Sequence, residues 1–179
     1  SYSKDNFKEG SRPSSNGAWL IANSYGTKYN DGGYFWLSYE EPSISDIYTM
    51  AVETTANYEN IYQYDGNGWS DAVSIPGNDF TGANVFTSSS SFEETLNAVS
   101  FYTISDNQKY TIKIYKNLTG TTPDTGTLAS ACTISGTADY SGYHTIKLPT
   151  SCTLSPGSKF AVAITYKYDA STKNQAYIP

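Results

Sequence analysis

The sequence predicts an all-β protein: an antiparallel, jelly-roll-like β-sandwich preceded by a β-hairpin. Three observations support this fold class. Seventeen tyrosines stand among many Ser, Thr, Asn and Gly residues. Tyr and Thr favour pleated, half-buried surfaces, whereas Gly, Asn and Asp favour turns. Short apolar runs alternate with turn signals at the spacing of a sandwich. The only helical candidate is the short segment 91–99, whose acidic start suits a first helical turn.

Alternation of apolar and polar residues places the individual strands. In 160–166 (FAVAITY) the even-numbered residues point one way and the odd-numbered Ala and Thr residues the other. In 110–116 (YTIKIYK) the two isoleucines face inward, and Lys113 and Tyr115 face outward. One buried and one wet face indicate an antiparallel sheet. Further strands are expected near 47–53, 59–64, 83–87, 96–104, 130–135 and 143–148.

The N-terminal part has a different organisation. Residues 1–16 are polar and aperiodic, so we expect an exposed loop or a frayed end. The apolar run 18–23 and the aromatic run 34–39 flank a loop rich in Gly, Asn and Asp, which predicts a β-hairpin. Pro42 then interrupts any strand. We therefore expect one domain over 1–45 and a second over 46–179.

Charge excludes one class of partner. The net charge is −6 and only 16% of residues are charged. A nucleic-acid backbone would be repelled, so no nucleic-acid partner is expected.

No apolar run approaches the roughly 18–20 residues that span a bilayer, so no membrane span is expected. A surface dominated by hydroxyl and amide groups is common on extracellular and cell-surface proteins, and we expect that location.

The two cysteines, Cys132 and Cys152, lie at the edges of expected strands. An even cysteine count with an extracellular type of composition predicts one disulfide between them. The bridge would close a loop of about 20 residues and contribute ~3 kcal/mol in the chain-entropy model. The alternative is a pair of free, buried thiols.

Residues 16–39 (NGAWLIANSYGTKYNDGGYFWLSY) carry a family resemblance. They resemble the end of the catalytic domain in papain-like (C1 family) cysteine peptidases. In that family a strand of the form W-x-I/V-K-N-S-W-G is followed by a Gly-rich loop and a strand of the form G-Y-F/I-x-I. Here the two elements read WLIANSYG (19–26) and GYFWL (33–37).

The resemblance implies a role for Asn23. In the family this side-chain oxygen accepts a hydrogen bond from the catalytic histidine and orients the imidazole toward the thiolate nucleophile. Tyr25 occupies the position of a tryptophan that shields this hydrogen bond from water. The family's Cys and His, which precede the Asn, are absent from residues 1–23. We therefore expect no peptide-bond cleavage by this chain alone, and a peptide or protein substrate for its parent.

The single histidine, His144, shares a strand face with Ile146 and Leu148. We interpret it as a packed sheet histidine rather than as a catalytic base, because a lone histidine on an apolar face is usually part of the core.

Residues 46–179 resemble the lectin-like domain that follows the catalytic domain in some bacterial papain-family peptidases. The resembling stretches include IYQYDGNGW (61–69), LNAVSFYT (96–103), GYHTIKL (142–148) and PGSKFAVAI (156–164). They support the fold more than an activity, because fold alone does not establish function.

A sugar or cell-wall ligand would need flat rings for the apolar sugar face and polar groups for its hydroxyls. One loop region combines them: Tyr62, Tyr64, Asp65, Asn67 and Trp69. The alternative is that Tyr62 and Tyr64 are sheet aromatics and Trp69 plugs a sandwich end. Asp65, Asn67 and Asp71 also offer hard oxygen ligands for calcium. They lack the spacing of an EF-hand, so a plain turn is the preferred interpretation and no cofactor is predicted.

Three hypotheses follow. In the first, the chain is the last catalytic hairpin and the accessory sandwich of an extracellular papain-like peptidase. In the second, it is a stand-alone glycan-binding module; in the third, it is part of a pseudopeptidase. A hairpin without its catalytic domain leaves Trp19, Phe35 and Trp36 uncovered. We therefore expect either a homodimer through the hairpin or burial of the hairpin against the sandwich.

Overall fold

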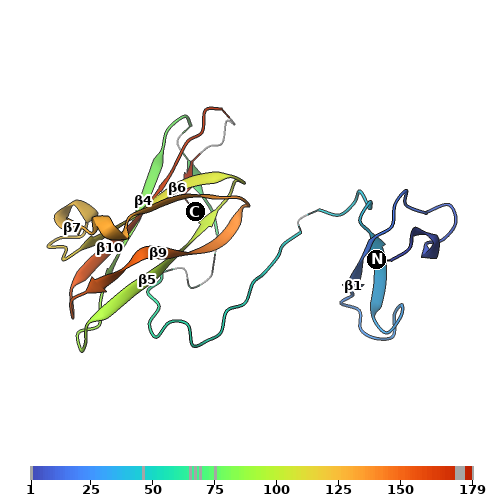
Figure 1. The fold of residues 1–179 in the computed structure, drawn as a ribbon, viewed down its shortest axis with the longest axis horizontal. Coiled ribbons are helices and arrows are strands. Elements are labelled where there is room, and N and C mark those ends of the chain that lie inside the picture. Colours follow the sequence, from blue (N-terminus) through green and yellow to red (C-terminus); the bar gives the residue numbers. More distant parts are fainter. Residues whose placement is uncertain are drawn as a thin grey trace. The chain divides into compact units, whose positions relative to one another are not determined.

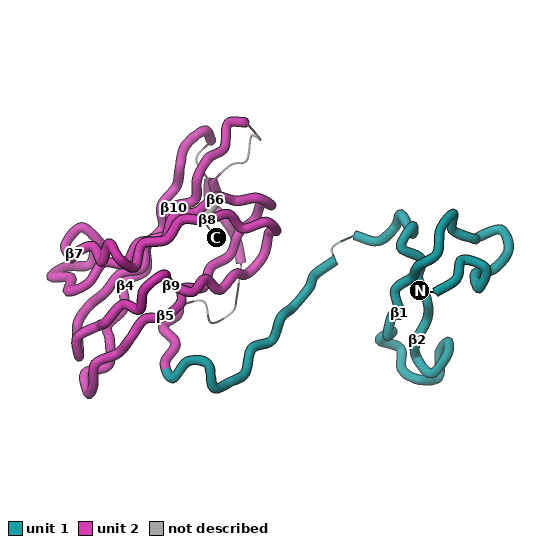
Figure 2. The backbone as a smooth tube through the Cα atoms, in the orientation of Figure 1, with its two compact units in different colours: residues 1–59 teal, residues 60–179 magenta. Residues whose placement is uncertain are grey.

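The computed structural model describes residues 2–45, 47–64, 66, 68, 70–74, 76–171 and 176–178. The chain divides into two compact units, residues 1–59 and 60–179 (Figure 2). This division lies later in the chain than the boundary at 45/46 expected from Pro42. Each unit is described by itself below.

Unit 1 is built on the expected β-hairpin. Strand β1 (Ala18–Ala22) pairs antiparallel with β2 (Tyr34–Ser38), with Leu20 opposite Trp36 in the register. The short 3-10 helix η1 (Lys4–Asn6) precedes the hairpin. The aromatic and apolar residues of both strands favour the pleated conformation, and the Gly-rich connection lets the chain reverse.

The first sixteen residues are mostly exposed, as expected, but they are tied to the hairpin rather than frayed. The Tyr2 ring stacks on Trp36 with the ring centroids 4.3 Å apart, and the Tyr2 carbonyl accepts the Gly17 N–H at 2.9 Å. The Ser3 hydroxyl caps η1 by accepting the Asp5 N–H. Of the two expected alternatives, the exposed loop therefore agrees with the structure and the frayed end does not, because aromatic stacking and backbone hydrogen bonds anchor the segment.

Unit 2 is the antiparallel β-sandwich predicted from the sequence (Figure 1). The larger sheet has the order β4-β10-β6-β7, with β8 also pairing β6, and β5 and β9 form a separate two-stranded sheet. Two short strands, β3 and β11, pair with each other. The strand bounds are β3 (Val73–Ser74), β4 (Phe80–Thr87), β5 (Glu94–Thr103), β6 (Gln108–Lys116), β7 (Thr127–Leu128), β8 (Ile134–Ala138), β9 (Gly142–Leu154), β10 (Lys159–Tyr166) and β11 (Tyr177–Ile178). Two 3-10 helices, η2 (Pro123–Thr125) and η3 (Ser130–Cys132), flank β7.

The core lies between the two sheets. Ile112 and Ile114 of β6 are fully buried, as their alternation predicted. Phe101 from β5 meets Tyr110 of β6 edge to face at 5.0 Å, so the sheets interlock through aromatic rings. Tyr166 at the end of β10 is also buried, and its hydroxyl donates to the Tyr102 carbonyl at 3.1 Å. Burial raises the pKa of the Tyr166 phenol.

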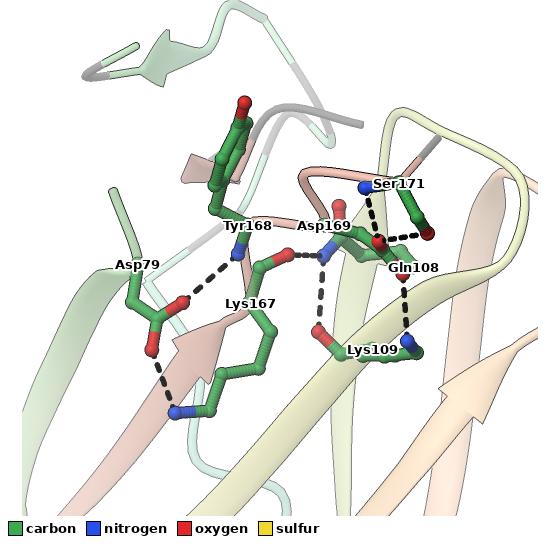
Figure 3. A network of polar contacts seen from close by, with 7 residues as sticks. All are labelled: Asp79, Gln108, Lys109, Lys167, Tyr168, Asp169 and Ser171. Carbon is green, nitrogen blue, oxygen red and sulfur yellow. Dashed lines mark hydrogen bonds and ion pairs between the residues drawn. The ribbon is translucent and has the colours of Figure 1, made fainter. Parts of the chain in front are cut away.

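A polar network holds the end of β10 against β6 (Figure 3). Lys167 and Asp79 form an ion pair at 2.7 Å, and Lys109 and Asp169 form another at 2.6 Å. The side chain of Gln108, only 2% exposed, donates to the carbonyls of Lys109 and Lys167. The amide thereby satisfies its donors inside the sandwich, as a buried polar group must.

Three sequence-based expectations about secondary structure are wrong. Segment 91–99 is not helical: it enters β5, because pairing with β9 and burial of Val99 outweigh the acidic helix-start signal. The strands expected near 47–53 and 59–64 do not form. The segment 130–135 divides into η3 and the start of β8.

His144 is a packed sheet histidine, as predicted. It lies opposite Phe101 in the register, with the rings 6.0 Å apart. Its Nε2 is 3.0 Å from the Thr103 hydroxyl, which also lies 3.3 Å from the Tyr140 carbonyl. When the hydroxyl donates to that carbonyl, its oxygen is left to accept the Nε2–H of the histidine. The half-buried ring is thus held against Phe101 and Thr103 of β5.

Candidate functional site

Asn23 follows directly on β1, where the loop to β2 begins. Its backbone N–H donates to the Gly33 carbonyl at 2.9 Å, which extends the hairpin ladder by one bond. Gly33 has φ +94°, and a Cβ there would lie 3.3 Å from the Gly26 carbonyl oxygen. A glycine is therefore required where the loop closes behind Asn23.

The side-chain amide of Asn23 is half satisfied. Its Oδ1 accepts the backbone N–H of Tyr25 at 2.9 Å, an Asx-turn that fixes the rotamer. A carbonyl oxygen has two lone pairs, so Oδ1 can accept one further donor. Its Nδ2 is buried and finds no hydrogen-bond partner within the described part of the chain. Buried amide donors are normally paired, so the site lacks a partner group.

Tyr25 stands close in sequence, but its ring points into solvent. The side chain is 79% exposed, and its ring meets the edge of Tyr29 at 5.9 Å. The shielding role of Tyr25 stays a prediction.

The hairpin that carries Asn23 has no core of its own. Ala18 is the only buried apolar side chain among the described residues of unit 1. The side chains left exposed on the two strands include Trp19 at 48%, Leu20 at 53% and Trp36 at 42%. Because successive side chains point to opposite faces of a strand, Trp19 and Leu20 show that both faces of the hairpin remain half exposed, although Tyr2 stacks on Trp36.

Glu40 anchors the N-terminal segment beside the hairpin. Its carboxylate accepts the backbone N–H groups of Ser14 at 2.7 Å and Ser15 at 2.8 Å, together with both serine hydroxyls. The Ser15 hydroxyl, followed by the Ser14 N–H, lowers the pKa of this carboxyl to about 2. This clamp was not foreseen from the sequence, because nothing in 1–16 marks its partner.

Two of the residues predicted to contact a sugar, Tyr62 and Tyr64, come together over β4. Tyr64 stacks on Phe86 with ring centroids 4.9 Å apart and planes 12° apart, and its hydroxyl donates to the Val85 carbonyl at 2.6 Å. Tyr64 nevertheless remains 68% exposed. One ring face is therefore occupied, while much of the side chain remains accessible. Asp65, Asn67 and Trp69 lie outside the described residues.

Tyr62 is tied to the sandwich. Its ring meets Phe160 edge to face at 5.3 Å, and its hydroxyl donates to Glu94 at 2.5 Å and accepts the Ser89 N–H at 3.1 Å. These contacts leave Tyr62 less free than Tyr64 to meet a ligand. Tyr62 packs against the larger sheet through Phe160, although it lies in no strand itself.

Glu94 is the residue of this region that sequence reasoning missed. Its carboxylate accepts hydrogen bonds from Asn60, Tyr62 and the Ser89 N–H. Burial by itself would raise the pKa of Glu94, but hydrogen bonds led by that of Tyr62 lower it overall. Glu94 lies in the segment expected to be helical, and no nearby motif signals its distant partners.

The cysteines are free thiols, both buried in the core of unit 2. The expected bridge is therefore not formed in the structure, and the pairing stays a prediction. Among the described residues, no group of three or more His, Cys, Asp or Glu side chains could hold a metal ion. Two of the three residues considered for calcium, Asp65 and Asn67, fall outside that part of the chain. No helix within the described ranges is long and apolar enough to cross a bilayer.

Comparisons with known proteins match both the sandwich and the whole chain. The family model described as "Lectin like domain" matches residues 61–177. The solved structure of the clostridial cysteine protease Cwp84 after propeptide cleavage superposes with a TM-score of 0.70 and 31% identity, covering 99% of this chain and 43% of that one. A second structure contains the cysteine protease and lectin-like domains of Cwp84, a surface-layer-associated protein of Clostridium difficile. It gives a TM-score of 0.68 and 30% identity, covering 99% and 38%.

The chain thus spans less than half the length of the solved proteins it matches. No curated protein sequence matched it.

Proposed function

This chain belongs to the lectin-like domain family through residues 61–177, and from that premise we propose that it works as part of a papain-like cysteine peptidase. Unit 1 supplies the asparagine that orients the catalytic histidine, and unit 2 is an accessory domain that binds a glycan or wall surface. The parent acts on peptide or protein substrates at the cell surface or outside the cell.

One observation carries the peptidase part of this proposal: the half-satisfied amide of Asn23 on a hairpin without a core. Its Oδ1 is held by the Tyr25 N–H and keeps one lone pair for an imidazole N–H. The half-exposed apolar side chains on both faces of the hairpin fit a strand pair that packs against a larger domain. The similarity to a cysteine protease over 99% of the chain, hairpin included, supports the same assignment.

In the proposed mechanism, Asn23 is a positioning residue. A histidine N–H donates to Asn23 Oδ1, which fixes the ring so that its other nitrogen pairs with the nucleophilic thiol. The imidazole takes the thiol proton and later returns a proton to the leaving amine. A buried, pre-oriented acceptor keeps the imidazole in one tautomer, so the ring need not reorganise during the reaction.

The thiols of this chain do not serve as that nucleophile. Cys132 and Cys152 are 4% and 1% exposed, and burial raises the pKa of Cys152 to about 12. A thiol must ionise and reach the substrate to attack it. Because the His144 ring is held against Phe101 and Thr103 of β5, we expect the chain by itself to cleave no peptide.

The test uses the longest product of the gene, assayed on a fluorogenic peptide with a thiol-reactive inhibitor as control. We expect inhibitor-sensitive cleavage that falls on the order of 10²-fold in kcat for Asn23→Ala, with KM little changed, because misplacing a catalytic group costs about this much. The pH profile should shift as the histidine loses its acceptor, and Asn23→Gln should recover part of the rate.

Two results would oppose the peptidase assignment. Equal kcat and identical pH profiles for the natural protein and Asn23→Ala would remove Asn23 from the mechanism. A longest product that cleaves nothing would favour the stand-alone binding module or a pseudopeptidase.

Glycan binding by unit 2 is the second function that we propose, and the exposed Tyr64 favours it. An aromatic ring supported from behind by Phe86 offers a rigid platform for the apolar face of a sugar. The test is a glycan array followed by calorimetry on the isolated chain. Tyr64→Ala should weaken binding, whereas Tyr62→Phe, which removes only the hydroxyl bound to Glu94, should leave affinity within about twofold. An affinity unchanged by Tyr64→Ala would place the ligand elsewhere.

A further inference from the structure

The two cysteines lie on elements that belong to different sheets. Cys132 ends η3, directly before β8 of the larger sheet, and Cys152 lies near the end of β9 in the two-stranded sheet. In the register of the smaller sheet Cys152 is opposite Leu96, beside the irregularity between Leu96 and Ala98. Both cysteines belong to the core cluster that the two sheets share. Any bond between them would cross from one layer of the sandwich to the other.

The two thiols are neighbours in this core, because η3, which carries Cys132, packs against β9, which carries Cys152. Burial, then this neighbour, raises the pKa of Cys152, while the positive charge of Lys116 acts in the opposite direction. Lys116 is held nearby because its Nζ donates to the Thr153 carbonyl at 3.2 Å. The pair therefore has one cation beside it that favours the thiolate needed for exchange.

Other uses of this pair find no support among the described residues. No third His, Cys, Asp or Glu side chain there completes a metal-binding group with them. Exposures of 4% and 1% keep both sulfurs away from any large substrate. Formation of a disulfide between the two sulfurs is the chemistry that this arrangement favours.

We propose that Cys132 and Cys152 form a covalent closure site, in which the two thiols become a cystine by exchange with a low-molecular-weight disulfide. One cysteine thiolate attacks a sulfur of the small disulfide, forms a mixed disulfide and releases one small thiolate. The second cysteine thiolate attacks the protein sulfur of the mixed disulfide and releases the other. Two electrons pass to the small disulfide, and the two protons lost by the cysteines convert its halves into thiols.

Burial sets when this reaction takes place. In the folded unit neither sulfur is accessible, so exchange occurs while η3 is still undocked, during folding. Cys132 lies on the short helix and is the less deeply buried of the two, so we assign it the first attack. Once closed, the bond is shielded by the same core from reductants, and it bridges the loop 133–151 that contains β8 and most of β9.

The experiment refolds the reduced full chain in a mixture of reduced and oxidised glutathione. The product is then denatured without reductant and treated with iodoacetamide. We expect an intact mass lower by two hydrogen atoms and no alkylation. Trypsin should then give peptide 117–147, which contains Cys132, joined to peptide 148–159, which contains Cys152. Adding a reductant before alkylation should separate the two peptides and label both.

Stability gives a second readout. The thermal midpoint of the natural chain should fall when the refolded protein is fully reduced under denaturing conditions and refolded with reductant. The double variant Cys132→Ala/Cys152→Ala should show one midpoint under both conditions. Two thiols that both react with iodoacetamide after oxidative refolding would overturn the proposal. So would a chain that stops at a stable mixed disulfide with glutathione. These mass measurements need no variant, so they decide the question even if the double variant fails to fold.

Discussion

The rings of Tyr64 and Phe86 are stacked, with their centroids 4.9 Å apart and an angle of 12° between their planes. This contact joins a segment without strand pairing to β4 of the larger sheet, and it supports the ring that we propose as a sugar platform. An aromatic pair of this kind contributes about 0.5–1.5 kcal/mol beyond the area that it buries.

Removing either ring should therefore destabilise unit 2 by a similar amount. We expect Tyr64→Ala and Phe86→Ala each to lower the free energy of unfolding, and the double variant to lower it by less than their sum, because both single changes remove the same contact. Urea denaturation of the four proteins measures this coupling. Strict additivity would indicate that the stack contributes nothing of its own.

Glu94 should hold residues 60–64 on the sandwich. Glu94→Gln weakens the charge-assisted hydrogen bonds from Asn60, Tyr62 and Ser89, and we expect a loss of about 1–2 kcal/mol. Tyr62→Phe, which removes one of these bonds, is the matched smaller change. Hydrogen exchange at the Ser89 amide reports the effect directly: it should accelerate in Glu94→Gln. Unchanged protection would show that the carboxylate is dispensable.

The carboxyl of Glu40 should titrate far below its ordinary range. Hydrogen bonds from Ser15 and Ser14 lower its pKa from 4.5 to about 2. Because the folded pKa is depressed, the stabilisation by this clamp is fully present above pH 4.5 and is lost as the pH falls toward 2. An NMR titration of the carboxyl carbon checks the midpoint, and Ser15→Ala should raise it. A midpoint near 4.5 in the natural chain would mean that the clamp does not form in solution.

The isolated chain should associate through its hairpin. Trp19, Leu20 and Trp36 remain 48%, 53% and 42% exposed, and exposed apolar patches of this kind favour self-association. Size-exclusion chromatography with light scattering should give a dimer that Trp19→Lys with Trp36→Lys converts to a monomer. A natural chain that is monomeric at high concentration would contradict the expectation, as would a dimer that survives both substitutions.

The stretch 47–58 should be the first site of limited proteolysis. Tyr48, Met50 and Val52 are 85–91% exposed, and the stretch contains no strand. Chymotrypsin should cleave after Tyr48 and leave residues 49–179 as the resistant product. Tyr140 is an internal comparison: it is 76% exposed, but its carbonyl is held by the Thr103 hydroxyl. Early cleavage within the sandwich would contradict the division into units.

Alternation of apolar and polar residues predicted the strands that have a hydrogen-bonded neighbouring strand on each side. The apolar face of β6 follows from its sequence, because Ile112 and Ile114 are fully buried. In β10, Ala161 and Ala163 on the face expected to meet water are buried as well, so alternation predicted the strand but not the burial of both its faces. Residues 47–53 and 59–64 were also expected to be strands, yet they form none. Alternation determines which face of a strand is apolar, whereas pairing depends on a free sheet edge elsewhere in the chain.

The same limit applies to the candidate sites. Asn23 could be proposed because the strand end, the glycine and the second strand around it resemble a peptidase motif that is local in sequence. Glu94 and Glu40 could not, because their partners lie 32 and 26 residues away in the chain. Contacts of this kind arise from tertiary packing, and short-range patterns carry no signal for them.

The described residues of unit 1 contain one buried apolar side chain, Ala18, and this has a thermodynamic consequence for a peptidase that uses the hairpin. A hairpin with so little internal burial gains most of its folding free energy from the protein surface that packs on it. The folded fraction of the hairpin therefore depends on how much of it is bound to that surface. In such a protein Asn23 would reach its working orientation only on docking. Assembly of the catalytic site and folding of this hairpin would then be a single coupled equilibrium. A substitution of Trp19, which is not a catalytic group, could then abolish activity.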